Sequence, residues 1–393
     1  MQNPSIQSSP LRNLSLVLCA LLHGLNHGLQ LMLPPLYLSI RDDLGLDGLG
    51  PVMLFGTIYF VTYAASSFPY GFLGDRYSKK RILVFGALLN SIAFLVAAGT
   101  KSYAVFVAAM VLGGVGGGAY HPVANALISN LFKGMVGRAF GLIGMGASLG
   151  LFLGPFASGS IAEQFGWRMS CLAFGLFGCG VAAAFGLIMP EEGAAETQEA
   201  ERAILWRSLF APFLAVIIVY GLRDFCFWGT TYLTPALSQE NLGFSKKTAG
   251  ALIGFMSLTG IVSQPLAGTL SDRLGRRRII FISLVIGSAT VFFLPYLNST
   301  FIFAGAFVGG FILLGTVPML DALVAEIVPP SVRGKVFGFI ITFGLMLGAL
   351  SPYAAGLLHD LTGGYQVPYL VLSVAGLAGA GLVFTIPAKR AHA

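Results

Sequence analysis

Few titratable side chains lie inside the long apolar segments of this sequence, and one group of them has helical spacing. His23, Asn26, His27 and Gln30 follow one another at i, i+3, i+4 and i+7, which places all four on one face of a helix. Histidine changes its charge near neutral pH, and imidazole and amide groups both hydrogen-bond ligands. This face is therefore a candidate for substrate binding, and its histidines are also candidates for relaying a proton.

Three other apolar segments contain polar side chains, which a bilayer core accepts at low cost only where they face a partner or a water-filled cavity. These residues are Tyr120, His121 and Asn125 in one segment, Arg223, Asp224 and Trp228 in a second, and Asp321 in a third. The predicted substrate-binding residues are His23, Asn26, His27, Gln30, Tyr120, His121, Asn125, Arg223 and Trp228.

Arg223 is the only basic side chain inside an apolar segment, and it stays charged at any physiological pH. It needs Asp224, Asp321 or an anionic substrate as its partner. One hypothesis is a bidentate clamp on the carboxylate or phosphonate of a substrate, and the alternative is a structural ion pair between Arg223 and Asp224. Asp224 and Asp321 are the candidates for carrying a coupled proton, because burial disfavours the charged form of a carboxyl group.

Two enzymatic motifs are incomplete in this sequence. His23 and His27 have the spacing of a zinc-metalloprotease helix, but Gly24 stands where the general-base glutamate is needed. The glycine-rich segment 113–118 lacks the Lys-Ser/Thr ending of a P-loop. We therefore expect no enzymatic activity, no ATP hydrolysis and no cofactor.

The composition indicates that these residues lie in membrane-spanning helices. Of 393 residues, 56% are hydrophobic and only 10% are charged, and the mean hydropathy is +0.82. A soluble domain has roughly 25% charged residues, whereas here apolar runs of about 20 residues, enough to cross a bilayer as a helix, alternate with short charged clusters. We predict an all-α membrane protein whose twelve spans are 14–38, 51–73, 82–99, 104–128, 138–160, 168–189, 209–237, 248–270, 279–297, 301–325, 336–358 and 367–387.

Lysines and arginines determine the predicted orientation of these spans. If the N-terminus is cytoplasmic, 17 of them fall on the cytoplasmic side and five outside, so the positive-inside rule places both termini in the cytoplasm and the chain in the inner membrane. The net charge of +7 is then explained by topology, and no nucleic-acid partner is expected. The predicted partners are the lipid bilayer, a small-molecule substrate and protons.

The chain contains an internal repeat with a period of 197 residues. The recurring positions are Asp75-Arg76 with Asp272-Arg273, the GRAFG of 137–141 with the GKVFG of 334–338, and Pro155 with Pro352. Duplications of this kind are common among transporters. The repeat predicts two six-helix halves, 1–189 and 208–393, joined by an acidic cytoplasmic linker at 190–207.

The two loops with Asp-Arg pairs resemble a known transporter motif. The GFLGDRYSKKR of 71–81 and the GTLSDRLGRRR of 268–278 look like the loop motif of the major facilitator superfamily. The resemblance covers nearly the whole chain. It implies two pseudo-symmetric halves whose helices 1, 4, 7 and 10 line a central cavity, with a substrate site at the interface of the halves. The polar residues described above fall on these four helices.

Two further resemblances concern the direction of transport. Gly141, Gly150, Gly154 and Pro155 fit the spacing G-x8-G-x3-G-P, which resembles the signature of proton-driven drug antiporters, although close packing of small residues in a membrane helix gives similar patterns. The HGLNHG of 23–28 and the GGVGGGAYHP of 113–122 resemble the fosmidomycin-resistance-like exporters. The predicted gating residues are Asp75, Arg76, Arg138, Gly150, Gly154, Pro155, Asp272 and Arg273.

Three functions stay open at this level. The leading hypothesis is a proton-coupled exporter of a small anionic or amphipathic compound that works by alternating access as a monomer. The second is an uptake symporter or facilitator of a small organic anion or metabolite. The third is a transporter of a divalent metal or metal chelate, with His23, His27 and His121 as ligands; a metal site is not the primary prediction, because helical spacing alone often produces such histidine pairs.

Overall fold

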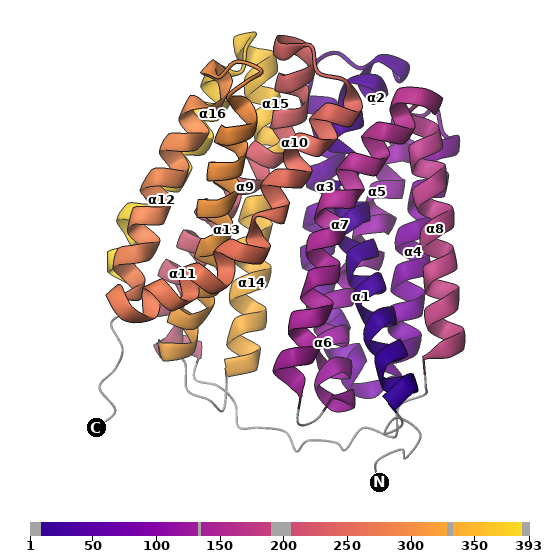
Figure 1. Ribbon diagram of the computed structural model, residues 1–393, viewed down its shortest axis with the longest axis vertical. Coiled ribbons are helices and arrows are strands. Elements are labelled where there is room, and N and C mark those ends of the chain that lie inside the picture. The colour runs from indigo at the N-terminus through magenta and orange to yellow at the C-terminus, as the bar shows by residue number, and fades with distance from the viewer. Residues whose placement is uncertain (1–8, 133–134, 190–205, 328–332, 387–393) are drawn as a thin grey trace. The chain divides into compact units, whose positions relative to one another are not determined.

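The computed structural model describes residues 9–132, 135–189, 206–327 and 333–386, and all regular structure in these ranges is helical (Figure 1). The α-helices are α1 (Ser9–Leu31), α2 (Tyr37–Asp43), α3 (Gly50–Arg76), α4 (Lys79–Gly99), α5 (Tyr103–Gly118), α6 (Tyr120–Leu131), α7 (Val136–Phe165), α8 (Trp167–Ile188), α9 (Trp206–Leu242), α10 (Lys246–Leu258), α11 (Gly260–Leu274), α12 (Arg276–Phe293), α13 (Ile302–Ile327), α14 (Arg333–Ala349), α15 (Ser351–Thr362) and α16 (Gln366–Leu382). Short 3-10 turns occur at Pro34–Leu36, Leu294–Tyr296 and Val383–Thr385.

The described residues form two compact units. The first lies within Met1–Gly45, Ile58–Glu201 and Ser245–Gly250, and the second within Leu46–Thr57, Arg202–Phe244 and Ala251–Ala393. Each unit therefore consists mostly of one copy of the sequence repeat, together with one short segment of the other copy. The predicted limits of the halves and of the linker stay a prediction.

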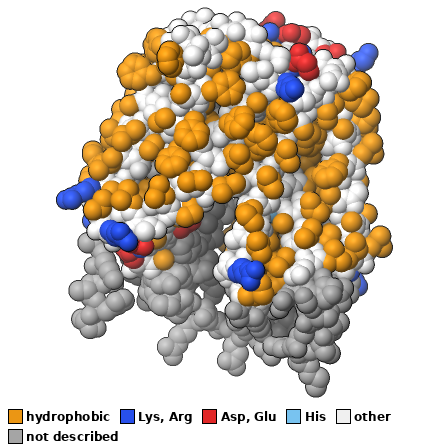
Figure 2. All heavy atoms as spheres, in the orientation of Figure 1, with side chains coloured by type: hydrophobic (Ala, Val, Ile, Leu, Met, Phe, Trp, Pro, Cys, Tyr) orange, Lys and Arg blue, Asp and Glu red, His pale blue; other side chains and the backbone are white. Residues whose placement is uncertain are grey.

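Eleven helical segments of the described residues are long and apolar enough to cross a membrane, and three of them, Asn13–Asp43, Tyr103–Ser129 and Lys246–Leu274, each contain two consecutive α-helices. They coincide with eleven of the twelve spans predicted from the sequence. The twelfth predicted span, 336–358, falls on α14 and α15, which are separated by a break at Leu350. On the face seen in Figure 2, hydrophobic side chains cover the helices between their ends, whereas charged side chains gather near helix ends. The prediction of an all-α membrane protein is confirmed.

The predicted span 104–128 consists of two helices that meet close to a proline, a residue that removes a backbone hydrogen bond from a continuous helix. α5 ends at Gly118 and α6 begins at Tyr120, so Pro122 lies in the first turn of α6, where no intrahelical N–H bond is needed. The carbonyl oxygen of Gly118 instead accepts a hydrogen bond of 3.0 Å from the Ser67 hydroxyl. The break places Tyr120 and His121 at the start of α6.

Helices α1 and α7 touch through glycines, which determines where the histidine face of α1 lies. A Cβ atom on Gly150 would lie 2.1 Å from the carbonyl oxygen of Gly24, and one on Gly154 would lie 2.6 Å from that of Gly28. Small residues permit this close approach of two membrane helices. A Cβ atom on Gly141 would instead point into open space among the described residues. Close packing therefore accounts for two glycines of the antiporter-like pattern.

We expect Gly150→Ala to destabilise the protein, and Gly144→Ala, on the same helix, to leave it unchanged or more stable. The added methyl group at 150 would overlap the Gly24 carbonyl, and overpacking of this kind costs about 1–3 kcal/mol. A Cβ atom at 144 points into open space among the described residues, and alanine favours a helix over glycine by about 1 kcal/mol. Thermal unfolding of the purified variants in detergent measures the difference. Equal melting temperatures for Gly150→Ala and the wild type would contradict the contact between α1 and α7.

Candidate functional site

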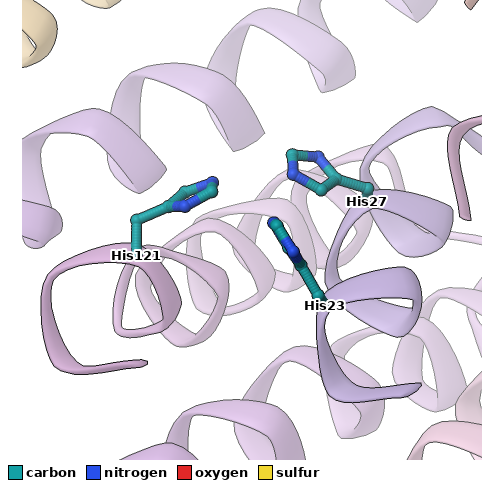
Figure 3. A group of neighbouring side chains, drawn as sticks. All are labelled: His23, His27 and His121. Atoms are coloured by element: carbon teal, nitrogen blue, oxygen red, sulfur yellow. The ribbon is translucent and has the colours of Figure 1, made fainter. Parts of the chain in front are cut away.

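Three histidines converge in the first unit (Figure 3). His23 and His27 point from α1 toward His121 at the start of α6, and the ring centroids are 4.9 Å apart for His23–His27, 5.3 Å for His23–His121 and 5.4 Å for His27–His121. Their ligand nitrogens all lie within 4.8 Å of one another, and each side chain is partly buried. Helical spacing on α1 brings the first two together, and the break between α5 and α6 positions the third.

Hydrogen bonds hold both histidines of α1 through Nδ1. His23 Nδ1 lies 3.1 Å from the carbonyl oxygen of Ile143 on α7, and His27 Nδ1 lies 2.8 Å from Oε1 of Gln30 on α1. Because these oxygens only accept hydrogen bonds, each Nδ1 must carry the hydrogen. Gln30, a predicted substrate-binding residue, therefore orients His27.

Tyrosine and asparagine side chains lie beside the three histidines. Tyr120 stacks on His23 with ring centroids 4.6 Å apart and donates a hydrogen bond of 3.2 Å to the carbonyl oxygen of Cys19. Asn26 Nδ2 donates a hydrogen bond of 3.0 Å to the Tyr63 hydroxyl. The polar residues predicted on this face thus share one environment of aromatic rings and amides.

The side chains around the three histidines differ from the predicted substrate-binding residues at two positions. Asn125 is exposed one turn further along α6. Tyr63 of α3 is not among the predicted site residues, yet it bonds Asn26 and its ring centroid lies 6.3 Å from that of His121. A tyrosine inside an apolar span gives no signal of its own, and only the packing of α3 against α1 and α6 identifies it.

The second unit contains the charged residues of α9. Arg223 is 2% exposed and forms an ion pair with Asp224, which is 4% exposed. Arg223 Nε donates a hydrogen bond of 3.0 Å to the Thr316 hydroxyl, and Nη2 donates one of 2.7 Å to the carbonyl oxygen of Leu313, both on α13. The guanidinium carbon lies 5.0 Å from the ring centre of Phe227. The structural ion pair, one of the two alternatives that the sequence leaves for Arg223, is present.

Asp321 of α13 lies in the same unit but bonds a different residue. Its Oδ1 accepts a hydrogen bond of 2.9 Å from the Tyr220 hydroxyl. Tyr220, Arg223 and Asp224 are spaced at i, i+3 and i+4 and so share one face of α9. Sequence reasoning missed Tyr220, although this spacing was an available signal.

Glycines of α14 allow α9 to come close at this face. A Cβ atom on Gly348 would lie 2.5 Å from the Cβ of Asp224, and one on Gly344 would lie 3.1 Å from the Cβ of Tyr220. Trp228, one turn beyond Asp224, is partly buried, and its ring centroid lies 5.0 Å from that of Phe227. The polar face of α9 is thus enclosed by α13, α14 and its own aromatic residues.

Charges at helix ends form a small network in the second unit. Arg276 at the start of α12 pairs with Asp272 of α11 at 2.7 Å and with Glu326 of α13 at 2.5 Å, so it links the ends of three helices. The other predicted gating charges are exposed: Arg273 in this unit, and Asp75, Arg76 and Arg138 in the first. Their part in gating stays a prediction.

We expect Arg223→Gln and Asp224→Asn each to lower the free energy of unfolding by about 3–5 kcal/mol, because each leaves the other charge buried without its partner. The double variant removes both charges and should regain much of that loss. A double-mutant cycle on the purified proteins, measured by unfolding in detergent, gives the coupling between the two side chains. Strictly additive losses would contradict a buried ion pair.

Known proteins resemble the chain in sequence over most of its length. The family profile described as Major Facilitator Superfamily matches residues 16–263 and 220–393. A protein of Cupriavidus pinatubonensis named "probable 4-methylmuconolactone transporter" is 27% identical over 79% of this chain and 76% of its own length. Multidrug resistance protein 2 of Bacillus subtilis is 26% identical over 80% of this chain and 81% of its own length.

The fold also resembles a solved structure. The crystal structure of a bacterial homologue of the human lysosomal transporter Spinster matches with a TM-score of 0.79 at 16% sequence identity, and the match covers 96% of each chain. The fold and the resemblance predicted from the loop motif are confirmed. The chain belongs to the major facilitator superfamily and is a multi-pass membrane transporter.

Proposed function

We propose that the chain carries a small organic anion together with a proton into the cell by alternating access. The observation that supports this function is the buried ion pair between Arg223 and Asp224. The first argument concerns charge. A carboxylate can be neutralised by one proton, whereas the guanidinium cannot lose its charge. The pair therefore has two states, in which Asp224 is either ionised or protonated. Only protonation of Asp224 removes the anionic partner that it provides to Arg223.

In this proposal Asp224 and the transported anion are alternative partners of one guanidinium. While Asp224 is ionised, it accepts from Nη1 of Arg223 and balances its charge. Once Asp224 is protonated, a carboxylate, sulfonate or phosphonate can take its place at Nη1 of the guanidinium. Binding of the proton and of the anion then favour each other, which is the linkage that cotransport requires.

The charge balance of the loaded state supports the same conclusion. A neutral Asp224, a cationic Arg223 and a singly charged anion sum to zero, so the loaded site crosses the membrane without an uncompensated charge, which would be costly there. Asp321, whose carboxylate accepts from Tyr220, provides a second group that can take up a proton. The relative named for 4-methylmuconolactone supports a small metabolite as cargo.

Proton-driven export, the leading hypothesis from the sequence, is the second candidate function. The glycine pattern of α7 and the similarity to multidrug resistance protein 2 support it. An antiporter requires that proton and substrate exclude each other. For an anionic substrate, the exchange of partners at Arg223 makes binding of the proton and binding of the substrate favour each other, as a symporter requires.

We further propose that the transporter lies in the inner membrane with both termini in the cytoplasm and works as a monomer. The distribution of lysines and arginines between the predicted loops supports this orientation. The bacterial sources of the similar proteins support the choice of membrane.

In proteoliposomes, we expect anion accumulation when the outside is more acidic than the lumen, and none when a protonophore collapses the gradient. The sign of the coupling does not depend on which way the protein inserts, so mixed orientations do not obscure it. Labelled carboxylates, sulfonates and phosphonates are the test compounds, with organic cations as the control. Accumulation driven by an acidic lumen would instead establish the exporter.

Asp224→Asn should abolish proton-driven accumulation and retain exchange of labelled for unlabelled anion. The amide cannot bind or release the coupled proton, whereas Arg223 stays available to the anion. Asp47→Asn, the same change at an exposed position between the first two spans, is the matched control and should retain both activities.

Loss of exchange as well, in a folded Asp224→Asn protein, would contradict the role of Asp224 as the proton site. If this variant does not fold, the wild type tests the same linkage, because its apparent affinity for the anion in exchange must fall as the pH rises.

A further inference from the structure

The three histidines of the first unit present an arrangement that the proposed function does not use. His23 and His27 come from α1 and His121 from α6, and Figure 3 shows the three rings turned toward one another. A pair of histidines at i and i+4 arises often from helical spacing alone. The third ring comes from a separate helix, whose start is determined by a break, so spacing on α1 does not explain the cluster.

The hydrogen bonds on Nδ1 decide which nitrogen of His23 and of His27 is free to bind a ligand. His23 donates from Nδ1 to Ile143 and His27 from Nδ1 to Gln30, so in the neutral form each ring carries its lone pair on Nε2. Nε2 of His23 is buried and has no hydrogen-bond partner among the described residues. A buried lone pair without a donor is costly, unless a cation binds to it.

We propose that His23, His27 and His121 bind one divalent transition-metal ion, with Zn²⁺ as the reference ion. Neutral imidazole is a preferred ligand of Zn²⁺, Cu²⁺ and Ni²⁺. Metal-binding histidines almost always donate their other N–H group to a carbonyl or carboxylate, which is the role that Ile143 and Gln30 have here. Three ligands leave a fourth position of a tetrahedral ion for water or for an oxygen atom of a small molecule.

The distances agree with this assignment. Tetrahedral zinc with Zn–N bonds of about 2.0–2.1 Å brings its ligand nitrogens to about 3.3 Å from one another. The nitrogens of the cluster lie within 4.8 Å. The terminal torsion of histidine is broad, so rotation of the rings can bring the nitrogens closer.

The surroundings also suit a divalent cation. The three histidine side chains are only partly buried, so part of the surface of the cluster is accessible to water or to a small molecule. The Tyr120 hydroxyl donates to the carbonyl oxygen of Cys19, and the Tyr63 hydroxyl accepts from Asn26, so both hydroxyls bond groups other than the three histidines. The histidines belong to the first unit and the Arg223–Asp224 pair to the second, and the proposed metal site does not depend on the proposed anion transport.

Metal binding by the full-length protein tests the proposal. The protein is purified in detergent through a tag without histidine and treated with a chelator. Titration with Zn²⁺ is followed by calorimetry, and titration with Co²⁺ by visible absorption, because tetrahedral Co²⁺ absorbs far more strongly than the aqueous ion. We expect one ion per chain and the tetrahedral spectrum. Absence of stoichiometric binding, or a spectrum like that of aqueous Co²⁺, would overturn the proposal.

Substitutions identify the ligands. His121→Ala should weaken Zn²⁺ binding by about 100-fold or more, and Gln30→Leu by about 10- to 100-fold, since Gln30 only orients His27. His359→Ala is the matched control: His359 lies in the second unit close to Asp360 and Glu240, and its loss should change nothing. Unchanged affinity in His121→Ala, or an equal loss in His359→Ala, would contradict the assignment.

A ligand replacement covers the case in which His121→Ala does not fold. His121→Cys supplies a thiolate, which also binds Zn²⁺ and Co²⁺. We expect it to retain binding and to add the intense near-ultraviolet charge-transfer absorption of a Co²⁺–thiolate bond. Binding without this absorption would show that residue 121 does not touch the ion.

Discussion

Hydrocarbon supplies no hydrogen bonds, so every polar group inside the spans of this protein needs a partner from the protein itself or from water in a cavity. The constraint acts on the backbone first. Where Pro122 interrupts the ladder of helical bonds, Ser67 takes up the carbonyl oxygen of Gly118. It acts on side chains in the same way, because Arg223 is surrounded by a carboxylate, a hydroxyl and a carbonyl oxygen. In the histidine cluster the Nε2 atom of His23 is buried and has no hydrogen-bond partner among the described residues.

Glycines determine the direction in which the polar faces of α1 and α9 point. In the first unit the backbones of α1 and α7 meet at Gly24 and Gly150, and in the second Gly348 of α14 lies against Asp224. Two helices in contact at their backbones have little freedom to rotate about their axes. The direction in which His23 or Arg223 points is therefore set by residues that carry no chemistry themselves. Chemical and packing residues alternate along the same helices for this reason.

The sequence alone predicted the helical membrane fold, because apolar runs, loop charges and a repeat of 197 residues are all strong signals in a single chain. It also placed His23 and His27 on one face, since i, i+4 spacing needs no tertiary information. It could not bring His121 to them, because that contact depends on the break between α5 and α6 and on how α6 packs. The bond between Tyr220 and Asp321 was missed for the same reason: it joins two helices whose mutual rotation follows from packing.

The repeat relates the two polar faces position by position. Adding 197 to His23, Asn26 and His27 gives Tyr220, Arg223 and Asp224. Each triplet lies on the first helix of its repeat, and this helix packs against glycines of the fifth span of the same repeat. One ancestral helix face has thus diverged into a face of neutral rings and amides and a face with a permanent charge. In a symmetric dimer of identical halves, any substitution would have altered both faces at once. Fusion of the two copies into one chain removed that restriction, so a change in ligand chemistry on α1 leaves the ion pair on α9 free to evolve separately.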